Sequence, residues 1–176
     1  MRAYFTSRAR SALIATSVLA TLLLGGCNPT YNWRDVASPD GAYKALFPAK
    51  PATFTRPVDL DGLRVEMTMT AAEVDGATFA IGSASAPSAA QAQTALPAMR
   101  RALLRNIGVA DAAAPLAAGS DGLQVDATGS SNGRPLRLHG RFVARGARIY
   151  QIIVLGATDA APPEQVEQFL TSFQPQ

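Results

Sequence analysis

Residues 63–72 read Leu-Arg-Val-Glu-Met-Thr-Met-Thr-Ala-Ala, an alternation of apolar and polar side chains. In an extended chain the leucine, the valine and both methionines fall on one side, while Arg64, Glu66 and the threonines fall on the other. This period of two is typical of an antiparallel strand that packs one face on a core and turns the other to water. We therefore interpret Met67 and Met69 as core side chains and not as metal ligands.

Turn signals predict further strands on both sides of this segment. Asp61-Gly62 precedes it and Asp75-Gly76 follows it, so we expect hairpins to residues 53–58 and 78–84. Pro57 cannot donate to a strand ladder, which makes residues 53–58 an edge strand. Short apolar runs between turn residues predict the remaining strands at 33–36, 42–47, 123–128, 136–144 and 148–155, the last three as a meander.

A long helix is predicted between the two groups of strands. Residues 87–106 are rich in Ala, Gln, Leu and Arg, and Ser88 can cap the first turn. Pro97 leaves two alternatives, a helix that is secure only from Ala98 onward or a helix with a kink. Gly108 ends the helix, and residues 109–119 are expected to form a loop. The apolar side of the predicted helix is formed by Leu96, Met99, Leu103 and Ile107. Arg100, Arg101 and Arg105 lie off that side.

A shorter amphipathic helix is predicted at residues 164–173. Pro163 suits its first turn, and Glu164 suits the positive end of the helix dipole. Strands joined by tight turns, with helices between and after them, indicate an antiparallel sheet with helices packed on its faces. We therefore expect an α+β domain in which a sheet of about six to seven strands carries one long and one short helix.

The amino-terminal residues have the pattern of a targeting signal. A basic start with Arg2, Arg8 and Arg10 leads into the mostly apolar residues 12–24. This run has the length of a secretory signal and falls short of the roughly 20 residues that cross a bilayer. It ends in Leu24-Gly25-Gly26-Cys27, which holds the only cysteine of the chain. This ending resembles the lipobox of bacterial lipoproteins.

The lipobox resemblance implies that residues 1–26 are removed and that Cys27 receives acyl chains such as palmitate. Two chains anchor a protein stably in a membrane. Residues 27–32 are then the lipidated cysteine and a short tether, followed by a single domain at residues 33–176. Asn28 favours the outer membrane by the sorting habit of enterobacterial lipoproteins, with the domain facing the periplasm. Tyr31 and Trp33 either rest at the lipid interface or pack inward, and we favour the inward position for Trp33.

The charge of the chain depends on this targeting segment. The whole chain has 16 basic and 13 acidic side chains, a net charge of +3. Three of the 16 basic residues lie in residues 1–26, which leaves 13 basic side chains against the 13 acidic ones. The basic balance therefore does not indicate binding to nucleic acid. With Cys27 acylated no disulfide can form, so stability must come from the core.

Residues that could carry catalysis or hold a metal are few. A nucleophile would need a partnered base, and His139, the only histidine, is expected in a strand beside arginines, where a structural or solvated role is favoured. Asp59 and Asp61 flank a tight turn and are interpreted as turn formers. The sequence has no glycine-rich phosphate loop and no His, Cys or carboxylate cluster with metal-ligand spacing. It therefore predicts no enzyme activity, no cofactor and no metal site.

A basic surface is the remaining candidate site. Its members are expected along one strand and the turn that follows: Arg137, His139, Arg141, Arg145 and Arg148. The opposite face of that strand holds Leu136, Leu138 and Phe142. Two interpretations stay open, a docking face for an anionic partner such as an acidic protein, a phosphate-bearing lipid or an envelope polymer, and an ordinary hydrated sheet face. Gly140 could introduce a bulge that shifts the register.

Several short motifs together resemble a known fold. A Phe47-Pro48…Pro51 corner precedes a Gly-x-x-x-x-Met strand at residues 62–67, and the closing helix contains Phe169-Leu170-x-Ser172-Phe173. Between them lie Gly140-Arg141 and Arg148-Ile149-Tyr150. This set resembles periplasmic domains of the PsbP-like fold, including DcrB-like bacterial lipoproteins. The resemblance implies an assembly or accessory factor that binds a protein partner.

We therefore expect a lipid-anchored protein of the bacterial cell envelope that acts as a non-enzymatic accessory, assembly or binding module. Its expected contacts are the membrane, through lipid on Cys27, and a protein partner in the envelope. The alternative function is a carrier or sensor of a small or lipidic ligand, held in a pocket between sheet and helix.

Overall fold

The computed structural model describes residues 30–110, 117–119 and 122–176. Its strands are β1 (Arg34–Ala37), β2 (Tyr43–Phe47), β3 (Ala52–Leu60), β4 (Leu63–Val74), β5 (Ala77–Ser85), β6 (Ala117–Gly119), β7 (Gly122–Ser131), β8 (Arg134–Arg145), β9 (Arg148–Ala157) and β10 (Gln174–Pro175), and its helices are α2 (Ala89–Asn106) and α3 (Pro163–Ser172). Seven strands form an antiparallel sheet in the order β3-β4-β5-β9-β8-β7-β6, and β1-β2-β10 form a smaller sheet. The expected α+β architecture on an antiparallel sheet is confirmed.

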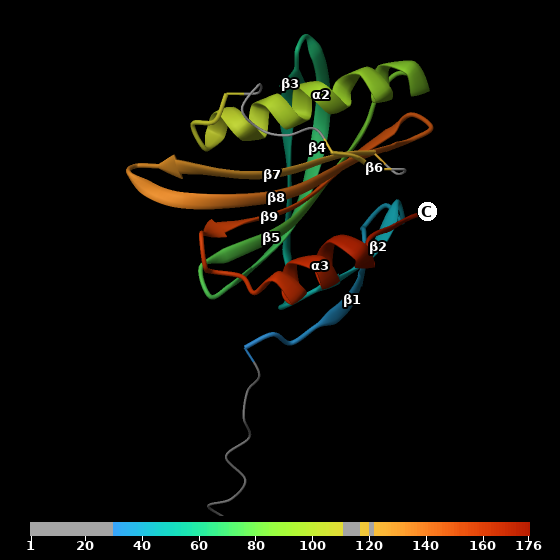
Figure 1. Ribbon diagram of the computed structural model, residues 1–176. Coiled ribbons are helices and arrows are strands. Elements are labelled where there is room, and N and C mark those ends of the chain that lie inside the picture. Colours follow the sequence, from blue (N-terminus) through green and yellow to red (C-terminus); the bar gives the residue numbers. More distant parts are fainter. Residues whose placement is uncertain (1–29, 111–116, 120–121) are drawn as a thin grey trace, which may run out of the picture.

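The large sheet is covered on both faces. Figure 1 shows α2 lying across one face, while α3 and the small sheet lie against the other. On the α2 side the core contains Met67, Leu96, Met99, Phe142 and Ile149. The side facing α3 has its own apolar cluster, which includes Phe47, Phe79, Tyr150, Phe169 and Phe173.

Strand β4 follows the expected alternation in its first half. Val65 and Met67 are buried, whereas Arg64 and Glu66 are exposed. In its second half the other face is buried as well, as the exposures of 2–8% at Thr70, Ala72 and Val74 show. The reason is the second apolar cluster, in which β4 meets β2 and α3. The strand is therefore half-buried only near the β3–β4 turn.

The first two strands do not join the large sheet, and the expectation of a single sheet is wrong. β1 and β2 pair with each other, and the carboxyl-terminal β10, which the sequence did not indicate, pairs with β2. The chain changes layer at the segment from Pro48 to Pro51, because proline lacks the N–H that would continue a ladder. The corner quoted from the sequence is therefore the crossing between two layers.

The helix α2 runs without interruption through Pro97, so the alternative of a helix that begins at Ala98 is wrong. Ser88 caps it, with the side-chain oxygen accepting a hydrogen bond of 3.2 Å from the backbone N–H of Gln91. Arg100 is only 3% exposed although it lies off the predicted apolar side. Ala92, Ala95 and Ala98 are buried as well, so the buried face of the helix is wider than that side. Arg101 forms an ion pair with Asp61 in the β3–β4 turn.

The meander β7-β8-β9 forms as predicted, and the bulge considered at Gly140 does not occur. The pairing of β8 with β9 runs unbroken from Leu136 opposite Ala157 to Arg145 opposite Arg148. Gly140 is needed for packing instead, since a Cβ there would lie 2.8 Å from the Cγ1 of Val125.

The expected loop at residues 109–119 contains a short strand. β6 pairs with β7 at the edge of the large sheet. A three-residue strand of small side chains has no apolar alternation by which the sequence could reveal it. Within the described part of the chain, neither helix combines the length and the apolar character needed to cross a membrane.

Candidate functional site

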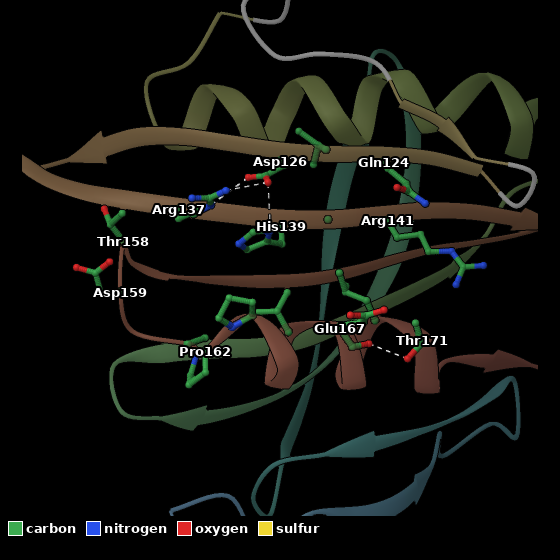
Figure 2. A pocket seen from close by; sticks show the side chains of 16 residues that line it. Gln124, Asp126, Arg137, His139, Arg141, Thr158, Asp159, Pro162, Glu167 and Thr171 are labelled. Atoms are coloured by element: carbon green, nitrogen blue, oxygen red, sulfur yellow. Dashed lines mark hydrogen bonds and ion pairs between the residues drawn. The ribbon is translucent and has the colours of Figure 1, made fainter.

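A groove of about 850 Å³ runs between α3 and the sheet strands β7 and β8. Figure 2 shows the sheet wall, which carries Arg137, His139 and Arg141 in a row, and the opposite wall, which carries Glu167 and Thr171. Leu170 and Val166 of α3 add apolar surface, and Thr158, Asp159 and Pro162 come from the turn between β9 and α3.

The alternation of β8 determines which side chains line the groove. Leu138 and Phe142 point to the α2 side and are at most 1% exposed. Arg137, His139 and Arg141 consequently face the α3 side, where they are half-buried. The basic face expected from the sequence is thus one wall of a groove, and its proposed role toward an anionic partner stays a prediction.

Asp126 of β7 lies beside two of these side chains and is hydrogen-bonded to one of them, Arg137. Arg137 donates from Nε to Asp126 Oδ1 at 3.1 Å and from Nη2 to Oδ2 at 3.0 Å. His139 Nδ1 lies 3.7 Å from Asp126 Oδ2. The bond from Asp126 raises the pKa of Arg137. This bidentate pair offsets one positive charge of the sheet wall.

Burial has the largest effect on His139 and lowers the pKa of its imidazole. Asp126 acts in the opposite direction, while Arg137 lowers the pKa further. A lowered pKa favours the neutral form of the imidazole at pH 7. The groove hydroxyl of Thr171 donates to the carbonyl oxygen of Glu167 at 2.7 Å and not to His139. The arrangement supplies charge, hydrogen bonds and shape for binding a ligand.

The remaining two members of the basic surface do not line the groove. Arg148 forms an ion pair with Asp40 in the β1–β2 turn, with Nη1 and Oδ2 2.5 Å apart. Its hydrogen bond is the main cause that lowers the pKa of Asp40, and the pKa of Arg148 is raised in return. Arg145 is exposed at the end of β8. The structure therefore brings three of the five predicted residues together.

Sequence reasoning missed the acidic residues of the groove, Asp126, Asp159 and Glu167. The sequence did contain a signal for Asp126. The period of two in β7 places Gln124 and Asp126 on one face of the strand and the apolar Val125 on the other face. The β7–β8 hairpin then sets Asp126 directly across from His139. Asp159 and Glu167 reach the groove only through the packing of α3 on the sheet, which no local pattern indicates.

The remaining residues considered as possible site residues are Asp59, Asp61 and Cys27. Asp59 and Asp61 are turn residues: Asp59 Oδ1 accepts a bond of 2.6 Å from the N–H of Gly62, and Asp61 has a φ of 55°. In residues 30–110, 117–119 and 122–176, no three His, Cys, Asp or Glu side chains gather as metal ligands would. Cys27 lies outside the described residues.

Tyr31 and Trp33, near the start of the described residues, pack inward. Tyr31 and Trp33 contact Phe79, with ring centroids 6.2 Å and 6.3 Å away. Trp33 Nε1 also donates to Gln165 Oε1 of α3 at 3.1 Å. The inward alternative is thus confirmed for Trp33. The chain enters the fold beside the helix that forms one wall of the groove.

Comparisons with known proteins identify no family. No family model and no curated protein matches the chain. A solved structure from Bacteroides thetaiotaomicron VPI-5482 is similar, with a TM-score of 0.44 and 14% sequence identity. The match covers 81% of this chain and 48% of the other, so this chain spans about half the length of that protein. A similarity this low does not show a shared function.

Proposed function

We propose that this protein is a lipid-anchored, non-enzymatic binding module of the bacterial cell envelope, and that it carries or senses a ligand in the groove between α3 and β7–β8. The proposal rests on the volume and the lining of this groove. Its volume of about 850 Å³ falls in the range of about 300–1,000 Å³ that small-molecule sites occupy. Its lining also combines apolar side chains of α3 with a few charged groups, as such sites do.

The charge distribution favours a ligand in the groove over an anionic partner on an open face. Asp126 holds Arg137 in a bidentate pair, and Asp40 holds Arg148. The acidic side chains of Asp159 and Glu167 stand near the arginines of the groove. A uniformly anionic surface would meet these carboxylates, and that contact would cost part of the attraction.

The lipid anchor and the location are part of the same proposal. The Leu24-Gly25-Gly26-Cys27 sequence supports acylation at Cys27, and Asn28 supports the outer membrane with the domain facing the periplasm. The PsbP-like assignment rests on the sequence motifs. Two of their residues, Phe47 and Phe169, are fully buried and pack edge to face with ring centroids 5.3 Å apart. An experimental structure whose layers do not superpose on a PsbP-like domain would refute that assignment.

Native mass spectrometry of the full-length protein, purified from its own membranes, tests the groove. We expect a ligand to remain bound to the wild-type protein. Thr171→Trp places a bulky ring on the exposed groove side of α3 and should abolish the bound mass. Gln168→Trp, equally exposed on α3 but outside the groove lining, should retain it. Equal retention by both variants would show that the ligand binds elsewhere.

A second candidate function is the accessory role, in which a protein partner adds an extended strand along β3. Among the strands that the structure describes, β3 lies at the edge of the large sheet and pairs only with β4. Phe54 on this strand is 53% exposed, the largest exposure of a bulky apolar side chain in the described residues. An apolar anchor on an unpaired edge suits strand addition, although Pro57 shortens the usable edge.

Site-specific crosslinking in cells separates the two functions. A photoreactive residue in place of Phe54 should capture one defined envelope protein if β3 docks a partner. The same residue in place of Glu73, on the inner strand β4, serves as the control. Equal capture at both positions would contradict docking at β3.

A further inference from the structure

The free edge of strand β3 has a nearly symmetric sequence. Residues 51–57 read Pro-Ala-Thr-Phe-Thr-Arg-Pro, so the threonines and the prolines stand at equal distances on either side of Phe54. Ala52 and Arg56 are the positions that differ. When two copies of such a segment run antiparallel about Phe54, like residues lie opposite each other. The segment is therefore suited to pairing with itself about a two-fold axis.

The ladder between β3 and β4 determines which backbone groups of this segment point outward. The β3–β4 turn consists of Asp61 and Gly62, with positive φ angles of 55° and 92°. In a two-residue hairpin of this kind the flanking Leu60 and Leu63 form a hydrogen-bonded pair, and hydrogen-bonded and open pairs alternate from there. Even-numbered residues of β3 thus bond to β4, while odd-numbered residues point their N–H and C=O groups to the free edge.

Prolines limit the part of this edge that can donate hydrogen bonds. Pro57 lies within the β3–β4 register without interrupting it, which a proline can do where its nitrogen faces away from the neighbouring strand. Pro51 immediately precedes the strand at another odd-numbered position. Between the two prolines, the N–H groups that point to the free edge are those of Thr53 and Thr55. The edge therefore offers a short and well-defined set of donors.

One antiparallel register of two copies satisfies all of these groups. With Phe54 opposite Phe54 of the second copy, Thr53 lies opposite Thr55, and each threonine both donates and accepts a backbone hydrogen bond. The prolines then lie opposite each other and face no threonine. Centring the pairing on Thr53 or Thr55 instead sets a threonine against a proline, which cannot donate. Centring it on Arg56 sets two like charges directly opposite.

Phe54 gains the most from this register. Its ring is exposed, although Phe54 lies opposite the buried Met69 of β4, on the sheet face that α2 covers. The Cβ atoms of directly opposite residues lie about 4.5–5.5 Å apart. The two rings would therefore cover each other, and the apolar surface that each ring exposes would leave water.

The other face of the edge carries a row of hydroxyl groups. The Oγ1 atoms of Thr53 and Thr70 lie 3.1 Å apart, and those of Thr55 and Thr68 lie 2.9 Å apart. In the register about Phe54, Thr53 meets Thr55 of the second copy, so both rows continue across the contact. Cross-strand threonine pairs of this kind stabilise a sheet.

The symmetry of this pairing suits two chains on one membrane. The two-fold axis that relates antiparallel edge strands stands perpendicular to the sheet, so both copies present the same face on the same side. Figure 1 shows α3 on the face opposite α2, and Tyr31 and Trp33 pack on that side, against Phe79 and Gln165. Anchors at Cys27 of both copies would thus enter one membrane. Anchoring also raises the effective concentration of the copies, which favours a contact of small area.

We propose that β3 pairs antiparallel with β3 of a second copy of this chain, centred on Phe54, and that the two large sheets become one continuous sheet in a membrane-bound dimer. This inference rests on the second candidate function, docking along β3, and names the partner. It is independent of the groove, whose lining includes no residue of β3.

Cysteine crosslinking of the full-length protein in its own membranes tests the register. After mild oxidation, Phe54→Cys should form a disulfide-linked dimer by itself, because directly opposite residues lie within reach of a disulfide. Ala52→Cys and Arg56→Cys should each form none alone, since identical positions then lie about 14 Å apart along the strands. The same two variants should crosslink when they are co-expressed. Wild type, whose single cysteine is Cys27, gives the background.

Two results of this experiment overturn the proposal. One is the absence of a dimer both from Phe54→Cys and from the co-expressed pair of variants. The other is a dimer from Ala52→Cys alone or Arg56→Cys alone at the yield of Phe54→Cys, because random collision or another register would then explain the contact.

Thr55→Pro tests the backbone hydrogen bonds. It removes an N–H that points to the free edge and keeps the ladder with β4, as Pro57 does. In the Phe54→Cys background it should lower the initial rate of dimer formation about tenfold, because both copies lose a donor. Thr55→Val keeps the N–H and should stay within about twofold. Equal rates for the proline and valine variants overturn the pairing of the strands.

Photocrosslinking at Phe54 separates this inference from the candidate function on which it rests. If it captures a different envelope protein and no second copy, self-pairing fails while β3 remains a docking edge. If it captures neither, both fail.

Discussion

Gly129 lies where the end of α2 packs against strand β7. A Cβ at this position would lie 2.1 Å from the carbonyl oxygen of Ile107, the residue that ends α2. The same carbonyl accepts a hydrogen bond of 2.8 Å from the N–H of Ser130. The glycine is therefore required because the end of α2 rests directly on the backbone of β7.

We expect Gly129→Ala to lower the free energy of unfolding by about 1–3 kcal/mol, since the methyl group must displace backbone and not a flexible side chain. The control is Ser130→Ala, which keeps the backbone bond and changes an exposed side chain, and it should stay within about 0.5 kcal/mol. Denaturant melts measure both. A loss no larger for Gly129→Ala than for the control would show that α2 and β7 are less closely packed.

His139 makes the stability of the protein depend on pH. The pKa of the folded imidazole is lower than its ordinary value of 6.5 because of burial, so the unfolded chain binds the proton more readily. The contribution to stability is therefore fully present above about pH 6.5 and is lost as the pH falls through the lower pKa of the folded state. Asp126, whose carboxylate faces the ring, limits the size of the effect.

We expect His139→Gln to reduce the stability lost between about pH 7.5 and pH 5, because glutamine does not titrate. Urea melts of wild type and variant at both pH values measure the difference. An equal loss of stability in wild type and in His139→Gln would show that other groups cause the acid sensitivity.

Among the elements, α3 determines whether the groove exists. Val166 and Phe169 bury one side of the helix, and Phe169 packs edge to face against Phe79 of β5 with centroids 5.4 Å apart. The opposite side stays exposed, and Thr171 on its edge faces the groove. The groove wall is therefore the flank of a helix that is fixed by its aromatic contacts.

We expect Phe169→Ala to cost about 3–5 kcal/mol, the range for removing a buried phenyl ring. Gln168→Ala, on the exposed side of α3, should stay within about 0.5 kcal/mol. Gln165 is unsuitable as a control, because it accepts a hydrogen bond from Trp33. Small and equal losses in denaturant melts would mean that α3 is only loosely attached, and the groove would then lose its fixed wall.

For the whole molecule, the anchor proposed at Cys27 lies close in sequence to residues that dock on the fold. Tyr31 and Trp33 tie the chain to α3 and β5, as their contacts with Gln165 and Phe79 show. The anchor proposed at Cys27 would therefore hold the domain in a restricted orientation, because the linker is short.

We expect Cys27→Ser to block acylation and normal removal of residues 1–26, because a serine cannot form the thioether. Labelling cells with a fatty-acid analogue and determining the mature amino terminus measure both effects. Label on the serine variant, or a wild-type amino terminus well beyond residue 27, would contradict the anchor.

The sequence was sufficient to identify most of the local elements. Alternation with period two and the turn dipeptides identified the antiparallel strands, Ser88 and Gly108 bounded α2, and Pro163 marked the start of α3. It also predicted that Arg137, His139 and Arg141 lie on one face of a strand, because the side-chain period of a strand is local.

How these elements combine followed from the tertiary structure alone. It separated β1 and β2 from the large sheet, paired β10 with β2, buried Arg100, and brought Asp159 and Glu167 opposite the arginines of β8. These features depend on contacts between segments far apart in the chain, and a local pattern holds no information about them. The groove exists because α3 packs by its aromatic side chains over part of the sheet face and leaves β7 and β8 open beside it.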